Sequence, residues 1–224
     1  MTIVAVTGLL AEAVIARRAG LQAICAGGRP ERTAAALADA LAAAPHPPHA
    51  LLSFGIAGGL DPVLPTGAVI AASAVLVEGR RIAATWRLPV GESRDVAAEP
   101  AIVQTAAAKA ALFRKTEAAA VDLESGIVAL AAERAGIPFG VLRTIADRAD
   151  EELPPAALVG LSPEGAPAIG PVLRSLAARP GQLPALIRTA GETRRALKAL
   201  VGACRVLDGL FRRVDAGDSL FDVA

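Results

Sequence analysis

The chain has 224 residues, of which 54% are hydrophobic, and its formal net charge is +1. This length suits one α/β domain or at most two small ones, and so small a net charge creates no field that would attract nucleic acid. Five Phe, one Trp and no Tyr leave few side chains on which bases can stack. These properties exclude nucleic-acid binding.

The apolar start of the chain predicts neither a signal peptide nor a membrane span. No basic residue precedes the apolar run, and Glu12 interrupts it, so it is shorter than a spanning helix needs to be. Later apolar stretches are broken by Pro, Gly, His or charged residues. The mean hydropathy of +0.49 therefore indicates a large buried core, and we expect a cytoplasmic protein.

Short apolar runs alternate with helical patterns along the first 150 residues. Strands are predicted at 3–7, 21–26, 50–54, 67–77 and 118–121, with a short hairpin partner at 82–86 and a last buried strand at 139–144. Helices are predicted at 10–19, 31–44, 101–113 and 124–135, most of them ended by glycine or proline. Strands that alternate with helices predict a single α/β domain, with a central parallel or mixed sheet flanked by helices on both faces.

The sequence changes character after Asp150. Residues 151–170 are rich in proline and predict a long ordered loop with room for one helical turn. The segment 183–213 places apolar residues at helical spacing, and we assign it to the same domain, which then spans residues 1–224. Its opposite face is basic and consists of Arg188, Arg194, Arg195, Lys198, Arg205, Arg212 and Arg213. Such a helix either packs its apolar stripe on the sheet, which helix patterning favours, or rests on an anionic membrane surface.

Residues that commonly bind metal ions are few. The two histidines, His46 and His49, stand in a proline-rich stretch that indicates a surface connection, and neither Cys nor an acidic residue close by completes a ligand set. Cys25 and Cys204 lie far apart in apolar surroundings and predict two reduced, buried thiols. We expect no metal ion.

Three carboxylates, Glu12, Glu124 and Asp147, each follow a predicted strand. Ligands of open α/β sheets bind at the carboxyl ends of strands. Taken singly, Glu12 and Glu124 are explained as charges near helix N-termini and Asp147 as a turn residue. The glycine-rich stretch 55–59 is either a tight turn or a loop whose N–H groups approach a ligand, and the prolines after it argue against a dinucleotide-binding helix. Together these features predict a ligand site.

Three motifs carry a resemblance to a known family. They are Gly-Ile-Ala-Gly-Gly at 55–59, Val-Asp-Leu-Glu-Ser at 121–125 and Leu-Arg-Thr-Ile-Ala-Asp at 142–147. In this order and spacing they resemble the purine nucleoside phosphorylase and methylthioadenosine nucleosidase superfamily over residues 1–150. Residues 150–165 and 179–184 resemble the hopanoid-associated phosphorylase branch, whose members release adenine from adenosylhopane and leave ribosylhopane or its phosphate. The resemblance implies a nucleoside phosphorylase-like fold and cleavage of a purine N-glycosidic bond.

Cleavage of the bond to adenine needs a proton for the leaving base and stabilisation of a ribosyl cation. The resemblance implies that Asp147 is the general acid at purine N7, with a pKa raised by a dry pocket. It implies that Glu124 holds the ribose 2′- and 3′-hydroxyls and that Glu12 is the base that activates water. Further substrate contacts are implied for Leu9, Leu123, Ile56, Ala57 and Gly58, with Leu9 and Leu123 at positions where relatives often place Met against the sugar.

Two positions depart from the family pattern. Ile56 stands where many relatives have a Ser that holds phosphate or the attacking water, and Ala146 stands where the nucleosidases have Ser before the catalytic Asp. The loss of both hydroxyls argues against a conventional phosphate site, and retention of Glu12 favours water as the nucleophile. Inorganic phosphate is the alternative co-substrate, held by Arg29 and Arg32, which are otherwise explained as solvated surface charges. No other cofactor is expected.

The expected substrate is a lipid-linked purine nucleoside, and the expected assembly is a homo-oligomer, as in relatives. With the apolar stretch 153–161 as a lid and the basic segment 183–213, the resemblance also suggests peripheral contact with the inner face of the membrane. Two alternatives stay open. One is a nucleosidase for methylthioadenosine or adenosylhomocysteine, and the other is a nucleoside- or lipid-binding protein without catalytic activity.

Overall fold

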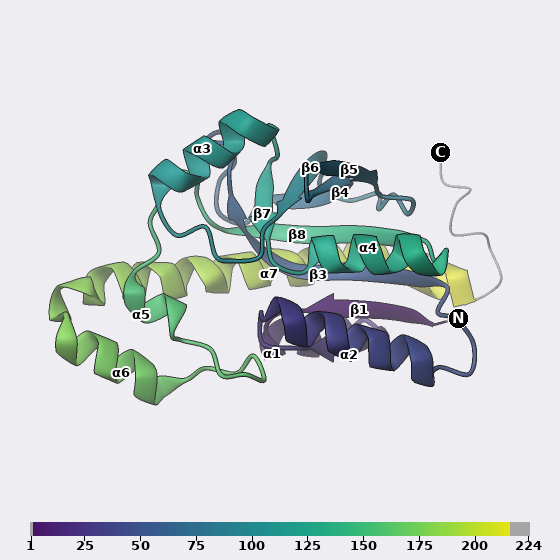
Figure 1. Ribbon diagram of the computed structural model, residues 1–224, viewed down its shortest axis with the longest axis horizontal. Coiled ribbons are helices and arrows are strands. Elements are labelled where there is room, and N and C mark those ends of the chain that lie inside the picture. The colour runs from purple at the N-terminus through teal and green to yellow at the C-terminus, as the bar shows by residue number, and fades with distance from the viewer. Residues whose placement is uncertain (1, 216–224) are drawn as a thin grey trace.

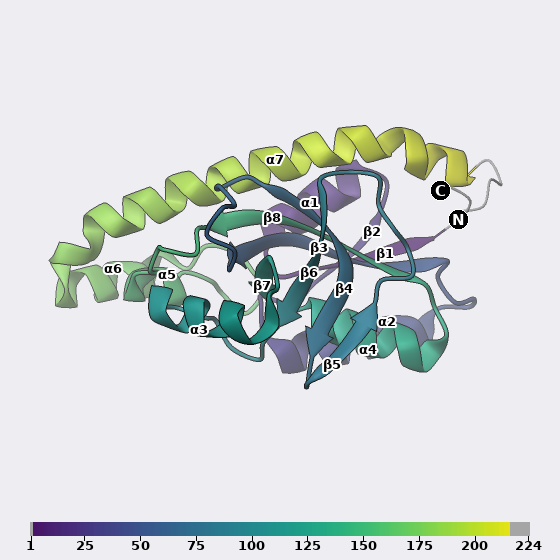
Figure 2. The ribbon, with the colours of Figure 1, turned by 90° about the horizontal axis from the view of Figure 1, so that it is seen from above.

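The computed structural model describes the backbone of residues 2–215 and the side chains of residues 2–207. Within this range, eight strands form one mixed sheet with helices on both faces (Figures 1 and 2). The strands are β1 (Ile3–Thr7), β2 (Gln22–Cys25), β3 (Ala50–Gly59), β4 (Val69–Val77), β5 (Arg80–Ala83), β6 (Glu92–Ala98), β7 (Ala120–Asp122) and β8 (Phe139–Asp147). The helices are α1 (Leu10–Arg18), α2 (Pro30–Ala43), α3 (Ala106–Thr116), α4 (Ser125–Ala135), α5 (Pro155–Leu158), α6 (Ile169–Ala178) and α7 (Leu183–Asp215), with a 3-10 turn at Pro180–Gln182. The predicted single-domain α/β fold class is confirmed.

The strand pairing brings four distant segments to one edge of the sheet. β2, β1, β3 and β8 are parallel neighbours, so their carboxyl ends meet at the same edge. β8 also pairs with β4, β4 with β6, and β6 with β7, and β7 then returns to the end of β3. This closed ring of strands places the start of α4, which follows β7, beside the ends of β1, β3 and β8.

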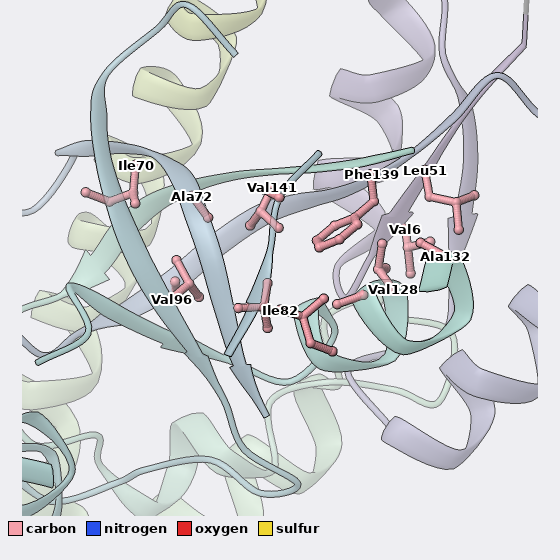
Figure 3. Packing of buried hydrophobic residues seen from close by; sticks show 14 of the residues in the cluster. Val6, Leu51, Ile70, Ala72, Ile82, Val96, Val128, Ala132, Phe139 and Val141 are labelled. Carbon is pink, nitrogen blue, oxygen red and sulfur yellow. The ribbon is translucent and has the colours of Figure 1, made fainter. Parts of the chain in front are cut away.

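Alternating side chains of the strands fill a core on each face of the sheet, as the two-residue period requires. Val6 of β1 faces α2 and α4, whereas Ala5 faces α1 and α7. Figure 3 shows Phe139 and Val141 of β8 packed with Val128 of α4. Each such buried aliphatic or aromatic side chain stabilises the fold by roughly 1.5–3 kcal/mol.

The long helix α7 packs its apolar stripe on the sheet, which is one of the two alternatives for the segment 183–213. Leu200, Cys204 and Leu207 are buried in the core that contains Phe54 and Leu142. The basic residues Arg188, Arg194, Arg195, Lys198 and Arg205 are exposed, and the side chains of Arg212 and Arg213 lie outside the described residues. The helices within the described part of the chain are each too short or too polar to cross a lipid bilayer.

Two predicted strand ends are wrong, and both lie at the candidate site. The glycine-rich stretch 55–59 is neither a turn nor a loop, because β3 continues through it to Gly59. A bulge between Ala57 and Gly58 shifts the register with β8, and Gly58 and Gly59 also pair with β7. β8 likewise extends to Asp147, which is therefore a strand residue and not a turn residue.

Three further differences have local causes. α3 begins at Ala106 instead of 101, because the side chain of Thr105 caps it by accepting a hydrogen bond from the N–H of Ala108 at 3.1 Å. β6 escapes prediction because its first half is polar, with Arg94 and Asp95 in ion pairs. α6 follows the predicted loop, and its proline, Pro171, lies in the first turn, where proline is tolerated. The single helical turn expected between 151 and 170 is present as α5.

Candidate active site

A cavity of about 270 Å³ lies at the carboxyl ends of β1, β3 and β8, beside the start of α4. It is close to the lower end of the volumes of small-molecule sites, about 300–1,000 Å³. Its lining includes all the residues predicted to act on or contact a nucleoside, namely Glu12, Glu124, Asp147, Leu9, Leu123, Ile56, Ala57 and Gly58. Arg29 and Arg32 are exposed and lie outside this lining, so their role in holding phosphate stays a prediction.

Glu12 lies in the first turn of α1 and is held by backbone N–H groups from two strand ends. Its Oε2 accepts hydrogen bonds from the N–H groups of Gly8 and Leu9 at 3.0 and 2.8 Å, and its Oε1 accepts one from Ile56 at 2.7 Å. Burial raises the pKa of Glu12, while the Arg143 guanidinium and these N–H groups lower it. Glu12 therefore both caps the helix, as first expected, and lines the cavity.

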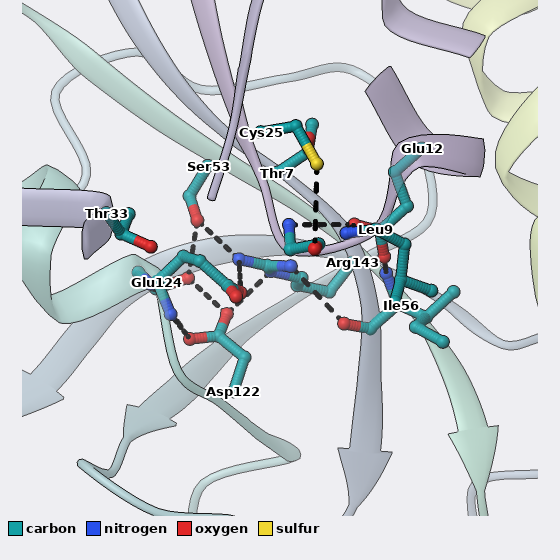
Figure 4. Close-up of polar contacts among 12 residues, drawn as sticks. Thr7, Leu9, Glu12, Cys25, Thr33, Ser53, Ile56, Asp122, Glu124 and Arg143 are labelled. Atoms are coloured by element: carbon teal, nitrogen blue, oxygen red, sulfur yellow. Dashed lines mark hydrogen bonds and ion pairs between the residues drawn. The ribbon is translucent and has the colours of Figure 1, made fainter. Parts of the chain in front are cut away.

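A buried arginine, Arg143, organises the carboxylates at the start of α4 (Figure 4). Its Nη2 lies 3.1 Å from Glu124 Oε2, and its Nε lies 2.6 Å from Asp122 Oδ2. It also donates hydrogen bonds to the hydroxyl of Ser53 at 2.6 Å and to the carbonyl oxygen of Ile56 at 3.3 Å. Arg143 belongs to the third motif, but the sequence alone predicts no role for it, because a strand pattern does not reveal which charges a central strand buries.

Among the described residues, three buried carboxyl groups share this one guanidinium. They belong to Glu12, Asp122 and Glu124. Burial is the largest influence on Glu124 and raises its pKa to about 7; Arg143 lowers it, and Asp122 and Glu12 raise it. Near neutral pH Glu124 is therefore present in both its neutral and its ionised form.

Two glycines provide the space that these carboxylates occupy. A Cβ atom on Gly8 would lie 2.6 Å from Glu124 Oε1, and one on Gly55 would collide with Glu12 and lie 2.8 Å from Arg143 Nη1. Both glycines are required by close approach to charged side chains. Gly55 of the first motif thus makes room for Glu12 and Arg143 because it has no side chain.

Asp147 ends β8 and is paired with a lysine that sequence reasoning missed. Lys109 of α3 is fully buried, and its Nζ contacts Asp147 Oδ2. Burial raises the pKa of Asp147, as predicted for a general acid, and Lys109 lowers it. A signal was present, because Leu112 and Phe113 follow Lys109 by three and four residues and place it on the apolar face of the helix.

Another wall of the cavity is formed by α5 with its flanking residues and by α7, and it is largely apolar. We call it the helical wall; its described members are Leu153, Ala157, Leu158, Leu161, Thr189 and Thr193. Leu161 and the neighbouring Ile102 are also exposed, by 39% and 47%. The stretch 153–161, predicted as a lid, thus covers one side of the cavity.

Within the described residues, no group of three or more His, Cys, Asp or Glu side chains is arranged to hold a metal ion. His49 instead accepts a hydrogen bond at Nδ1 from the N–H of Thr2 at 3.1 Å. Neither Cys25 nor Cys204 is joined in a disulfide; Cys204 is buried as predicted, whereas Cys25 is only half-buried.

Residues 96–166 match the family model described as Phosphorylase superfamily. Among curated proteins, no sequence gives a significant match. Solved structures of 5′-methylthioadenosine/S-adenosylhomocysteine nucleosidases do match. For the Campylobacter jejuni enzyme the TM-score is 0.58 at 14% identity, over 90% of this chain and 99% of that chain. For a mutant of the Helicobacter pylori enzyme with 5′-methylthioadenosine in its active site, the TM-score is 0.61 at 15% identity, over 92% and 99%.

The 5′-methylthioadenosine nucleosidase of Arabidopsis thaliana matches with a TM-score of 0.58 at 15% identity, over 99% of this chain and 98% of that chain. At such identities the likeness establishes the fold. Glu124 and Asp147 lie within the segment that matches the family model. The chain therefore has the nucleoside phosphorylase-like α/β fold that these nucleosidases share.

Proposed function

We propose that the chain is an enzyme that cleaves the N-glycosidic bond of a purine nucleoside, with water as the nucleophile. The observation that carries the proposal is the convergence of Glu12, Glu124 and Asp147 on one cavity at the sheet edge. Glu12 and Asp147, the outer two in the chain, are more than a hundred residues apart, so chance would rarely bring the three together. Their chemistry matches the needs of the reaction, a proton donor, a group that faces a cation, and a base.

Asp147 supplies the proton to the leaving base. As its proton passes to purine N7, the bond between the ribose C1′ and the purine nitrogen breaks, and the electron pair of that bond leaves with the base. Burial keeps the pKa of Asp147 raised, so the protonated acid is available closer to neutral pH than for an ordinary aspartate.

Glu124 faces the sugar on which positive charge develops. Its carboxylate accepts hydrogen bonds from the ribose 2′- and 3′-hydroxyls and stabilises the cation at C1′. Arg143, 3.1 Å from Glu124 Oε2, fixes the orientation of this carboxylate. It also prevents the carboxylate from turning away into the core.

Glu12 activates the attacking water. A carboxylate has about four acceptor sites, and three are used by the N–H groups of Gly8, Leu9 and Ile56. The fourth remains for a water molecule, whose proton passes to Glu12 as its oxygen bonds to C1′. Burial raises the pKa of Glu12, and Arg143 and the backbone N–H groups partly offset this rise.

We further propose that the nucleoside is lipid-linked, with adenosylhopane as the substrate and ribosylhopane as the product of hydrolysis. The apolar helical wall and the exposed Ile102 at the cavity support this assignment, because they offer an apolar path for a tail. The resemblance of residues 150–165 and 179–184 to the hopanoid-associated branch points the same way. A homo-oligomer is proposed on the family resemblance.

The same proposal includes contact with the inner face of the cytoplasmic membrane. Ile169 and Leu173 of α6 and Leu183 and Ile187 of α7 are 69%, 59%, 47% and 64% exposed. They belong to the stretch 168–191, which contains three Arg and no acidic residue and projects beyond the sheet in Figures 1 and 2. Exposed apolar side chains among cations suit an anionic bilayer surface. We therefore place the membrane contact on residues 168–191 and not on the basic face of α7.

The main alternative substrate is methylthioadenosine or adenosylhomocysteine, which the names of the structural neighbours favour. A binding protein without catalytic activity has less support, since it would need neither a base nor an acid. Phosphate in place of water would require a site outside the carboxylate cluster, such as Arg29 and Arg32.

Adenine release from adenosylhopane in detergent micelles and from methylthioadenosine, each with and without phosphate, tests the proposal. We expect release from adenosylhopane without phosphate. Release from methylthioadenosine alone would leave the reaction standing and overturn the lipid substrate. Release that requires phosphate would overturn water as the nucleophile, and binding of nucleoside without turnover would overturn the enzymatic assignment.

A further inference from the structure

Lys109 is a buried cation to which the reaction outlined above assigns no role. It lies on α3, a helix that carries none of the three carboxylates, and its side chain is 0% exposed. Taking an ammonium group out of water costs several kcal/mol unless other groups compensate. Its position therefore needs an explanation.

The contacts of Lys109 satisfy the ammonium group fully. Its Nζ contacts Asp147 Oδ2 and donates hydrogen bonds to the carbonyl oxygens of Arg148 at 2.6 Å and Glu151 at 2.9 Å. An ammonium group has three N–H donors and no acceptor, so these described partners use all of them. Lys109 is thus held in one orientation.

The same contacts fix the end of β8. Asp147 is the last residue of the strand, and the chain turns away directly after it; the turn is closed by a 3.0 Å hydrogen bond from the Arg148 N–H to Glu151 Oε2. Because Lys109 binds both the carboxylate and the carbonyl oxygens of this turn, it locks the direction in which Asp147 points. With Oδ2 occupied by Lys109, Oδ1 is the oxygen left for a ligand.

We propose that Lys109 is the positioning residue of the general acid, orienting Asp147 and stabilising the carboxylate that forms when the proton leaves for the purine. This inference rests on the proposed function. The proton moves from Asp147 Oδ1 to N7, the electron pair of the breaking bond stays with the base, and Lys109 keeps all its protons. The product state is then a neutral Lys109–Asp147 ion pair in place of an isolated buried anion.

Other charged groups face Asp147 from the elements around it. Burial raises the pKa of Asp147 most, Lys109 lowers it, and Glu151 raises it. Asp147 in turn raises the pKa of Glu192 of α7, which burial and a hydrogen bond with Glu151 raise to about 7. Among these groups Lys109 makes the acid stronger, so its removal raises the pKa of Asp147.

The test is the pH dependence of adenine release by Lys109→Met and Lys109→Gln, with Lys115→Met as the matched control on the exposed side of the same helix. Losing a hydrogen bond to a charged group predicts a fall in kcat of about 10- to 100-fold. Because Asp147 must be protonated, the limb on which activity falls with rising pH moves to higher pH. Lys109→Arg keeps the positive charge, so the pH at which activity falls should stay unchanged. Glu192→Gln measures how much Glu192 contributes to that pH.

A merely structural lysine would lower the folded fraction and leave that limb unmoved, which would overturn the inference. A second readout does not depend on activity. The ¹³C NMR titration of the Asp147 carboxyl carbon, assigned with Asp147→Asn, is expected to shift to higher pH in Lys109→Gln. Equal titrations in Lys109→Gln and the parent protein would overturn the role of Lys109, whether or not the parent protein releases adenine. Absence of release from the parent protein would overturn the proposed function alone.

Discussion

The side of the cavity formed by β1, β3, β8 and the start of α4 is polar and buried, whereas the helical wall formed by α5 and α7 is apolar and partly exposed. On the first side, which we call the sheet wall, Glu12, Glu124 and Asp147 are each held by charged or backbone partners. On the helical wall, Leu161 is 39% exposed. The rigid, hydrogen-bonded side is suited to breaking a bond, and the apolar side is suited to choosing what is attached to the nucleoside.

The largest expected effect lies on the sheet wall. Glu12→Gln removes the base but keeps an oxygen that can accept from the backbone N–H groups. Loss of general base catalysis lowers kcat for phosphate-free adenine release by about 10²- to 10⁴-fold. Glu31 is an exposed residue of α2, so Glu31→Gln is the control and should retain full activity. Release by Glu12→Gln at the rate of the parent protein would contradict the role of Glu12.

Arg143→Met tests whether the sheet wall depends on its shared cation. The variant leaves Asp122 and Glu124 buried without their partner, and removing one member of a buried ion pair costs about 3–5 kcal/mol of unfolding free energy. Urea denaturation measures this loss against Arg134→Met, an exposed position on α4. A loss below about 1 kcal/mol, the range of surface pairs, would show that the cluster is solvated.

The sheet wall should also make stability depend on pH. Burial raises the pKa of Glu124 from 4.5 to about 7 in the folded protein, so the folded state binds this proton more tightly than the unfolded state. The resulting stabilisation is complete below about pH 4.5 and is lost as the pH rises through 7, by at most about 1.4 kcal/mol per pH unit. Denaturation at several pH values is expected to show this decline.

Glu192 titrates in the same range and with the same sign, so Glu124→Gln should remove part of the decline and the double variant with Glu192→Gln a larger part. Glu12 and Asp147, whose pKa values burial also raises, contribute to the remainder. A stability that rises from pH 5 to pH 8 would contradict the charge assignment of the cluster.

The smallest effect is expected on the helical wall. Leu158→Ala removes apolar surface that would contact a lipid tail, so KM for adenosylhopane should rise by about 10-fold, as for a few buried methylene groups, with kcat nearly unchanged. Val63→Ala, 76% exposed and outside the cavity lining, is the control. Equal KM values for adenosylhopane would indicate that the tail does not lie against this wall.

The sequence predicts the sheet wall far better than the helical wall. Buried apolar runs are visible in the sequence, so Glu12, Glu124 and Asp147 are found by their position after such runs, although β3 and β8 continue further than the runs predict. Lys109 and Arg143 are missed because their partners lie on other elements, and no local pattern records that a charge will be buried. The extension of β3 through Gly55 is missed because glycine weakens strand patterns, although here its missing side chain makes room for Glu12.

The helical wall is harder to predict because proline ends helices and also starts them. The prolines of 151–170 predict a loop correctly, but Pro171 stands in the first turn of α6, and the same residue type gives opposite signals in the two places. The apolar side chains of α6 also lack a buried face, so the usual relation between amphipathic pattern and core does not hold there.

Adenine release in phosphate-free buffer by the parent protein and by Asp147→Asn tests the central claim most directly. The account predicts that the parent protein releases adenine and that the rate falls about 10²- to 10⁴-fold in Asp147→Asn, with thermal denaturation showing that the variant is folded at the assay temperature. Equal rates for the two proteins would contradict the account, because the bond would then break without the acid at the end of β8.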